Sequence, residues 1–353
     1  MASLVLDQLA TFGPDRCQRL SYEQASAYAH ELVRSQYENF TVVSWLLPRR
    51  LRHHFAHVYA FCRWADDLGD ETGDRQRSLS LLAWWRSELD RCYQGEPRHP
   101  VFVALEPTIR EHDIPRRPFD DLIDAFVQDQ QVSRYQTWDQ VLDYCTRSAN
   151  PVGRLVLYLC GHRDEQRQRL SDATCTALQL ANFWQDVRRD ILERDRVYIP
   201  EEVARRHGLD VGLMVKAVKL EGPECQSSTG CSCAGGPSAG VRAILPAYRA
   251  TLKELVDRTW PLFDQGRGLW PLVAPDVRLD IRLFTLGGEA ILKKIDRMNY
   301  ETLVRRPSLG KAGKAALLLR ALAWRAWEVL PGAGAGASDG ASRQGAGVEL
   351  HGD

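Results

Sequence analysis

The sequence predicts an all-α protein. Apolar residues recur every three to four positions along most of the chain, and strict alternation over five or more residues is nearly absent. Pro and Gly interrupt this pattern at intervals, as in QGEPRHP and RRPSLG. Because an apolar stripe at the helical period has to be buried, and 44% of the residues are hydrophobic, the helices should pack around a common core.

The predicted helices follow one another along the chain. LRHHFAHVYAFCRWADDL carries one apolar face, formed by Leu51, Phe55, Val58, Tyr59 and Cys62. SLSLLAWWRSELDRCY repeats this pattern, and further helices are predicted at 118–131, 137–146, 150–161, 172–192, 241–265, 275–296 and 311–329. Thr137, with Gln140 three residues later, indicates the start of one of them.

We expect one helical domain at 30–330, preceded by an N-terminal segment at 1–29. Residues 221–240 are rich in Gly, Ser, Pro and Cys, which predicts a flexible insertion. Cys225, Cys231 and Cys233 lie in this insertion without the paired spacing of a zinc site. Residues 331–353 are too poor in apolar side chains to form a core, so they are predicted to be a disordered tail.

Charge and cysteine content narrow the functional classes. Lys plus Arg and Asp plus Glu both number 46, so no global field favours nucleic acid or an anionic membrane. No apolar run reaches the roughly 18 to 20 residues that span a bilayer. Most of the nine cysteines fall on apolar helix faces, as expected for reduced thiols, and we therefore expect a cytoplasmic protein.

Two pairs of aspartates stand out from this background. Asp66 and Asp70 lie in CRWADDLGDE, and Asp186 and Asp190 lie in QLANFWQDVRRD. Four residues of helix turn through about 400°, so each pair places two carboxylates on one side, a turn apart. A single such pair is usually a solvated face. Here both pairs stand among large apolar residues, where like charges need a compensating cation.

A hard divalent cation suits this arrangement, because Mg²⁺ takes oxygen ligands and often joins carboxylates to substrate phosphates. Gln179 and Asn182 extend the stripe of Asp186 and Asp190 backwards along the same helix face. Arg63, three residues before Asp66, is placed to contact a phosphate oxygen. Two such stripes facing one another would form an acidic site for a metal-bound diphosphate.

Four blocks of this sequence, in order, resemble the squalene and phytoene synthase family of head-to-head prenyl transferases over about residues 30–330. They are LLPRRLRHHFAHVYAFCRWADDLGDE, RYQTWDQVLDYCTRSANPVGRLVL, QLANFWQDVRRDILERDRVYIP and IRLFTLGGEAILKKIDRMNYETLVRRPSL. The resemblance implies a single-domain isoprenoid-synthase helical bundle around a central cavity, in which Mg²⁺ holds prenyl diphosphates.

YENFTVVSWLLP, YCTRSANPVG and NFWQDVRRD are similar to the bacterial hopanoid-pathway branch, the squalene synthase-like or hydroxysqualene synthases. Phytoene synthases more often have V-A-G-x-V-G and N-I-L-R-D-V-G-E-D at the corresponding blocks. Gln185 stands where that pattern has an Arg beside the diphosphate, and Gln36 stands where this branch often has His.

This branch implies conversion of presqualene diphosphate and water to hydroxysqualene and diphosphate. Two or three Mg²⁺ ions would be held by Asp66, Asp70, Asn182, Asp186 and Asp190. The diphosphate would be bound by Arg63, Gln179 and Arg196. Catalytic roles would fall to Tyr59, Tyr144 and Tyr198, and the substrate cavity would include Phe40 and Phe183. Aromatic faces stabilise a nearby cation by about 0.5–2 kcal/mol.

Other readings stay open. One is a squalene or phytoene synthase that condenses two farnesyl or geranylgeranyl diphosphates, with NADPH required for the reductive squalene reaction. Another is a non-catalytic, prenyl-synthase-like partner subunit. Tyr59, Tyr144 and Phe183 also fit plain core positions, while Asp67 and Glu71 are expected to be solvated or to support the ligands. A C30 product suggests peripheral membrane contact and possible contact with pathway enzymes; a nucleic-acid partner is not expected.

Overall fold

The computed structural model describes residues 4–36, 48–222, 236–310 and 313, and in these residues every regular element is helical. The prediction of an all-α protein is confirmed. The elements are α1 (Leu4–Phe12), α2 (Tyr22–Gln36), η1 (Arg49–Leu51), α4 (Arg52–Asp70), α5 (Arg75–Tyr93), α6 (Pro100–His112), α7 (Arg117–Asp129), α8 (Trp138–Ser148), α9 (Asn150–Leu159), α10 (Glu165–Arg194), α11 (Glu201–Arg206), α12 (Val211–Glu221), α13 (Ala239–Gly266), η2 (Arg267–Leu272) and α14 (Pro275–Arg297).

The helix bounds mostly match those predicted, and the differences have local causes. The helix expected at 172–192 begins seven residues earlier, because Asp164 caps it by accepting a hydrogen bond from the Arg167 amide at 2.9 Å. Thr137 caps α8 through the Gln140 amide, as its position indicated. The helix predicted at 311–329, residues 331–353 and most of the 221–240 insertion lie outside the described residues. The predicted division into domains stays a prediction.

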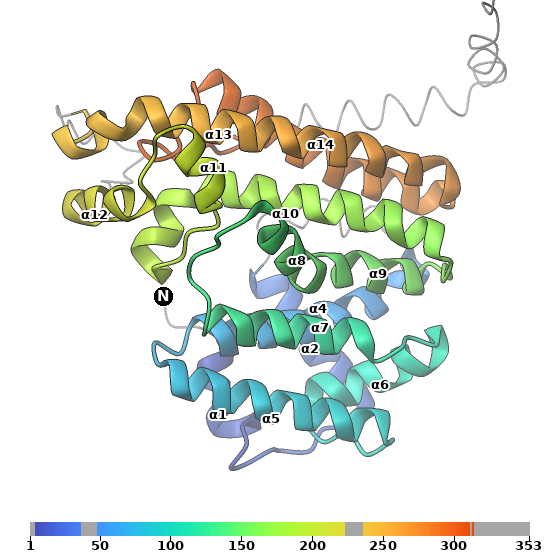
Figure 1. The fold of residues 1–353 in the computed structure, drawn as a ribbon. Helices are drawn as coiled ribbons and strands as arrows, with labels where there is room; N and C mark the ends of the chain where they lie inside the picture. The colour runs from blue at the N-terminus through green and yellow to red at the C-terminus, as the bar shows by residue number, and fades with distance from the viewer. Residues whose placement is uncertain (1–3, 37–47, 223–235, 311–312, 314–353) are drawn as a thin grey trace, which may run out of the picture.

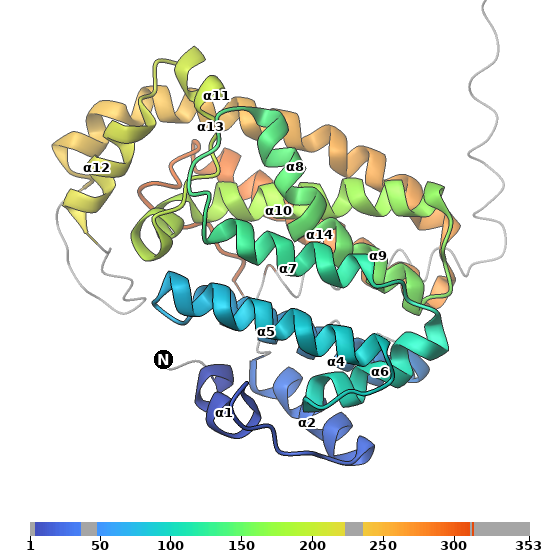
Figure 2. The ribbon, with the colours of Figure 1, turned by 60° about the horizontal axis from the view of Figure 1, so that its bottom comes forward.

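The helices form two layers with a joint between them (Figure 1). One layer holds α1, α2 and α4 to α7, and the other holds α10, α13 and α14 with the short α11 and α12 at one end. Helices α8 and α9 lie between α7 and α10, and Figure 2 shows the same order from another side. Each layer has its own apolar cluster, so the seam between the layers is where polar groups can gather.

Two packing details set the geometry of this seam. Gly69 lets α4 approach α7, since a Cβ atom there would lie 3.2 Å from the Phe126 Cβ atom. At the end of α10, Asp195 takes a left-handed conformation with φ of 52°. The chain then turns back, and the Val197 amide donates to the Ser133 carbonyl at 2.9 Å. The residues after α10 are therefore returned to the end of α7.

Candidate active site

The first aspartate pair lies at the C-terminal end of α4. The Asp70 carboxylate is buried, and its two oxygens lie 3.0 Å from guanidinium nitrogens of Arg194 and Arg196. The Asp66 side chain is 43% exposed and lies 3.6 Å from Arg63. Partial burial and the neighbouring Asp70 raise the pKa of Asp66 to about 7. The neighbouring arginines therefore compensate the negative charge of an ionised Asp66 only in part.

The second pair lies on α10, one turn apart as its spacing predicted. Asp186 is paired with Arg306 through both carboxylate oxygens, with Arg306 Nη2 3.0 Å from Oδ2. Burial and the adjacent Asp186 raise the pKa of Asp190 to about 7. In each pair, one carboxylate is bound by arginine, Asp70 or Asp186. The other, Asp66 or Asp190, has a raised pKa and is costly to ionise.

Arg194 connects the two pairs. Its guanidinium binds Asp70, and its charge lowers the pKa of both Asp66 and Asp190 from the values that burial would give. The ends of α4 and α10 therefore meet around this arginine. Across the described ranges, however, no three of the aspartates bring oxygens within 4.8 Å of one another. They form two separate carboxylate faces, and desolvated carboxylate oxygens are a donor set that fits Mg²⁺.

Other predicted metal and diphosphate residues lie nearby. Asn182 is exposed and Gln179 is half-buried on α10, N-terminal to the aspartates. Arg63 is held within α4 by contacts to Asp66 and Asp67. Of the two alternatives expected for Asp67, solvated or supporting the ligands, the structure agrees with the second, because Asp67 is fully buried and pairs with Arg63.

Arg196, predicted to bind diphosphate, lies in the seam between the two layers. It is buried, 3.0 Å from Asp70 and 3.4 Å from Asp129. Although burial opposes it, Asp129 and Asp70 raise the pKa of the Arg196 guanidinium. Arg196 therefore stays charged and ties α4 to α7.

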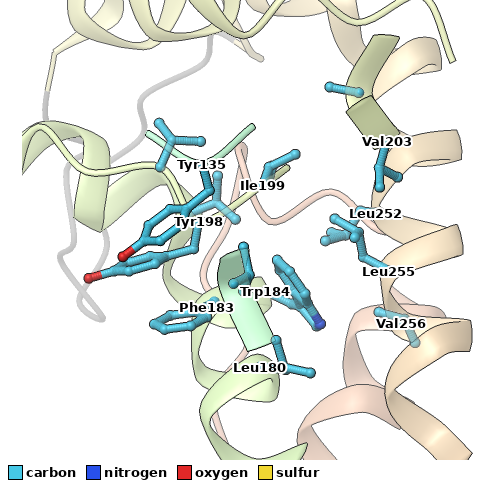
Figure 3. Packing of buried hydrophobic residues seen from close by; sticks show 14 of the residues in the cluster. Tyr135, Leu180, Phe183, Trp184, Tyr198, Ile199, Val203, Leu252, Leu255 and Val256 are labelled. Atoms are coloured by element: carbon cyan, nitrogen blue, oxygen red, sulfur yellow. The ribbon is translucent and has the colours of Figure 1, made fainter. Parts of the chain in front are cut away.

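Two of the three predicted tyrosines meet at Asp129. The Tyr144 hydroxyl donates to Asp129 Oδ2 at 2.7 Å, and the Tyr198 hydroxyl donates to Oδ1 at 3.4 Å. Tyr198 stacks on Phe183 with ring centroids 3.7 Å apart, and in Figure 3 the hydroxyls of Tyr135 and Tyr198 point to the same side, away from α13. Asp129 was not among the predicted site residues. Its sequence signal was an acid that closely follows the apolar run Ala125-Phe126-Val127.

The surroundings of Asp129 bring its pKa close to neutral pH. Burial raises this pKa to about 6, while Arg196 and the Tyr144 hydrogen bond keep it from rising further. Tyr59 lies apart from this group, on α4 near Arg63, and burial raises its pKa to about 12. Phe40 falls outside the described residues.

Residues after α14 cross over α10. Gln185 Nε2 donates to the Pro307 carbonyl at 2.6 Å, and Arg188 Nη1 donates to the Leu303 carbonyl at 3.0 Å. These contacts place Arg306 on Asp186. Gln185, which replaces an arginine of the related pattern, is therefore buried against the C-terminal segment.

One cleft on the described surface, of about 420 Å³, is lined by residues from Glu201 to Gly212, away from the aspartates. A smaller cleft, of about 230 Å³, is lined by Asp129, Arg194 and Arg196 among others. Its place beside the charged seam makes the smaller cleft the more relevant one for chemistry. Among the helices that the structure describes, none is long and apolar enough to cross a membrane.

Known proteins resemble this chain in sequence and in fold. The family model for squalene/phytoene synthase matches residues 33–222. Hydroxysqualene synthase of Zymomonas mobilis is 36% identical over 181 residues, 50% of this chain and 59% of that protein, so the chain spans less than two thirds of that relative. Hydroxysqualene synthase of Rhodopseudomonas palustris is 34% identical over 264 residues, 74% of this chain and 79% of that protein.

A phytoene synthase and a solved structure are also similar. Phytoene synthase of Thermus thermophilus is 31% identical over 291 residues, covering 82% of this chain and 89% of that protein. The crystal structure of a squalene synthase (HpnC) from Alicyclobacillus acidocaldarius superposes with a TM-score of 0.67 and 41% identity, covering 79% of this chain and 95% of that one.

Proposed function

The chain belongs to the squalene/phytoene synthase family of head-to-head prenyl transferases, and on this basis we propose that it converts presqualene diphosphate and water to hydroxysqualene and diphosphate. The observation that carries the proposal is that Arg194, on the helix that holds the second aspartate pair, binds Asp70 of the first pair, and that Arg196 links Asp70 to Asp129. The similarity to two hydroxysqualene synthases supports the choice of reaction.

Five side chains would hold two or three Mg²⁺ ions: Asp66, Asp70, Asn182, Asp186 and Asp190. Bound Mg²⁺ would neutralise the charge that develops on the leaving diphosphate. Arg194 and Arg196 both contact Asp70, and their planar, charged guanidinium groups bind phosphate oxygens well. Arg63 and Gln179 are proposed to bind the diphosphate from the flanking turns.

In the proposed reaction the carbon–oxygen bond breaks, and its electron pair leaves with the diphosphate. The carbocation that remains would be stabilised by aromatic faces, for which the stacked Tyr198 and Phe183 are the best placed, with Phe40 and Tyr59 as further candidates. Water then bonds to the cationic carbon and loses a proton. Burial of the Tyr198 and Phe183 rings keeps other water away until that step.

The proton needs an acceptor, and Asp129 is proposed for this role. With a pKa of about 6, Asp129 is mostly ionised at neutral pH, and this pKa is near enough to neutral pH for the carboxylate to accept a proton readily. The Tyr144 and Tyr198 hydroxyls that it accepts from would orient the attacking water or relay its proton.

The alternative is a complete synthase that condenses two farnesyl or geranylgeranyl diphosphates, and similarity to the Thermus phytoene synthase favours it. Pure protein with Mg²⁺ should be incubated with presqualene, farnesyl or geranylgeranyl diphosphate, with and without NADPH. We expect hydroxysqualene from presqualene diphosphate without NADPH. A C30 or C40 product from farnesyl or geranylgeranyl diphosphate alone would reject the proposed assignment.

Matched variants test the metal site. Asp66→Asn and Asp186→Asn should each lower turnover at least 100-fold, because each removes a charged ligand. Glu165→Gln, an exposed acid at the start of α10, should leave turnover unchanged. Unaltered turnover in both aspartate variants would contradict the metal assignment. Peripheral membrane contact, proposed because a C30 product must enter lipid, is tested separately by sedimentation with liposomes.

A further inference from the structure

A second group of metal-ligating side chains lies where α4 meets α6. His54 of α4, with Glu111 and His112 at the C-terminal end of α6, offers three ligand atoms that all lie within 4.8 Å of one another. His54 Nε2 lies 3.5 Å from Glu111 Oε1, and the rings of His54 and His112 are 4.3 Å apart. In the part of the chain that the structure describes, no other three such side chains come this close.

The other face of His54 is fixed by a chain of hydrogen bonds. His54 Nδ1 lies 3.0 Å from Thr108 Oγ1, and the same oxygen lies 2.9 Å from His57 Nδ1. His57 Nε2 in turn lies 2.9 Å from Ser26 Oγ. A hydroxyl has one proton, so Thr108 can donate to only one of the two imidazoles while accepting from the other.

One direction of this chain prepares His54 as a ligand. If His57 Nε2 donates to Ser26, then Thr108 donates to His57 and accepts from His54 Nδ1–H. The lone pair of His54 then lies on Nε2, which faces Glu111. A ligating histidine in a protein metal site usually donates its other ring N–H to an oxygen acceptor, and the Thr108 hydroxyl oxygen would be that acceptor here. Burial of His54 also favours the neutral imidazole that a metal requires.

His112 gives an independent indication that this cluster binds a ligand. Its Nε2 atom is buried and has no hydrogen-bond partner among the residues that the structure describes. A buried imidazole nitrogen without a partner costs free energy. A cation bound by this cluster would offset that cost and also hold the Glu111 carboxylate.

We propose that His54, Glu111 and His112 bind one Zn²⁺ ion, with water completing the coordination. Two imidazoles and one carboxylate are ligands of zinc and similar transition metals, whereas Mg²⁺ prefers oxygen alone. Bonds of about 2.0–2.1 Å in a tetrahedron put ligand atoms about 3.3 Å apart. The Glu111 side chain is 64% exposed and free to close the remaining gap.

This ion would act on structure, at a distance from the aspartates. His54 and Asp66 are twelve residues apart on α4, or about 18 Å at 1.5 Å per residue. Zinc would pin the N-terminal half of α4 to the end of α6, while the other end of α4 carries Asp66 and Asp70. The proposal does not depend on which prenyl diphosphate the enzyme uses.

The test uses the full chain with Cys225, Cys231 and Cys233 changed to serine, so that thiols do not bind the probe. Excess Mg²⁺ covers the aspartates during titration with Co²⁺ and then Zn²⁺. We expect one Co²⁺ per chain, visible absorption of cobalt with nitrogen and oxygen ligands, displacement by one equivalent of Zn²⁺, and a higher midpoint of thermal unfolding.

Glu111→Gln and His112→Gln should each weaken Zn²⁺ binding at least 10-fold, and Thr108→Val should weaken it about 10-fold through the loss of the outer hydrogen bond. The matched control is His207→Gln, in a His–carboxylate pair with Glu254 at 2.7 Å, which should bind like the parent. Glu111 and His112 lie at the C-terminal end of α6, and circular dichroism checks that all three variants are folded. A parent chain without stoichiometric Co²⁺, or Glu111 and His112 variants that bind as tightly as the control, would overturn the proposal.

Discussion

Asp129 shows how one buried acid organises the seam between the layers. It accepts from the hydroxyls of Tyr144 and Tyr198 and faces the charged Arg196. Arg196 also pairs with Asp70, so the position of one guanidinium links the proposed base to the first aspartate pair. A substitution at Asp129 should therefore also change the position of Arg196 and its contact with Asp70.

We predict that Asp129→Asn keeps the fold but loses most turnover. Asparagine still accepts from the two tyrosines but takes no proton, so kcat should fall about 10²–10⁴-fold. The measurement is hydroxysqualene formation under saturating presqualene diphosphate, with circular dichroism as the check on folding. Asp124→Asn, an exposed acid on the same helix, is the control. Equal kcat in the two variants would remove Asp129 from the reaction.

The pKa of Asp66 predicts how pH affects the stability of the metal-free protein. The folded-state pKa of about 7 lies above the unfolded value, so the folded state binds more protons between about pH 4 and 7. Stability contributed by this group is present at low pH and is lost as pH rises through 7. Asp66→Asn should therefore be more stable than the parent at pH 8, and this advantage should shrink at pH 5.

The expected gain at pH 8 is about 1 kcal/mol, since solvent screens a partly exposed carboxylate. Urea unfolding in EDTA at both pH values gives the free energies of unfolding. Saturating Mg²⁺ should reverse the order at pH 8, because the cation needs the ionised side chain. A gain that grows as pH falls would show that the ionised form is favoured instead.

At the scale of elements, α10 is central because α13 and α14 pack closely against it. Trp184 donates to Thr259 Oγ1 on α13 at 3.0 Å. Gly288 of α14 leaves no room for a side chain, as a Cβ atom would lie 2.5 Å from Phe263 Cζ and 2.7 Å from Leu178 Cδ2. The neighbouring Gly287 has open space.

This contrast gives a matched pair of substitutions. Gly288→Ala should lower the free energy of unfolding by about 1–3 kcal/mol, because the methyl group forces Phe263 and Leu178 to move. Gly287→Ala should raise it by up to about 1 kcal/mol, since alanine favours helix. Urea denaturation of both variants decides the matter. Equal effects would mean that α14 sits farther from α10 than described.

The segment after α14 predicts a competition at Asp186. Arg306 occupies this carboxylate, so a cation that binds Asp186 has to displace the guanidinium. Arg306→Gln should raise the apparent affinity for Mg²⁺ several-fold, measured by calorimetric titration. Arg305→Gln, exposed on the same turn, is the control. Weaker Mg²⁺ binding in the Arg306 variant would show that this arginine helps the site rather than competing for it.

The sequence predicts contacts within an element far better than contacts between elements. The pairing of Asp66 with Asp70 and of Asp186 with Asp190 follows from the helical repeat alone. That Asp70 binds Arg194 and Arg196 depends on the turn at Asp195 and on how α4 and α10 are rotated, which periodicity does not specify. The meeting of His54 with Glu111 and His112 depends on packing of α4 on α6 and has no local signal.

For the whole molecule, the candidate site bridges the two layers. Asp66 and Asp70 come from α4 and Asp129 from α7 in one layer, while Asp186, Asp190 and Arg194 come from α10 in the other. A ligand that binds residues of both layers therefore also stabilises the contact between the layers.

We predict that Mg²⁺ with inorganic diphosphate raises the free energy of unfolding by about 2.7 kcal/mol at a hundredfold excess over Kd. Differential scanning fluorimetry should show a higher unfolding midpoint, and EDTA should abolish the shift. The double variant Asp66→Asn with Asp186→Asn should show no shift, while Glu165→Gln should respond like the parent. A full shift in the double variant would place the ligand elsewhere.

The order of the layers along the chain has a consequence for synthesis. Helices α1 to α7 end at Asp129, so the layer with Asp66 and Asp70 leaves the ribosome before α10 is made. Those acids then exist without Arg194, Arg196 or the second aspartate pair. On the proposed function, a nascent or truncated chain that stops before residue 186 has only half of the site and cannot break the carbon–oxygen bond of its substrate. The proposed carbocation would therefore form only after the chain that shields it has been made.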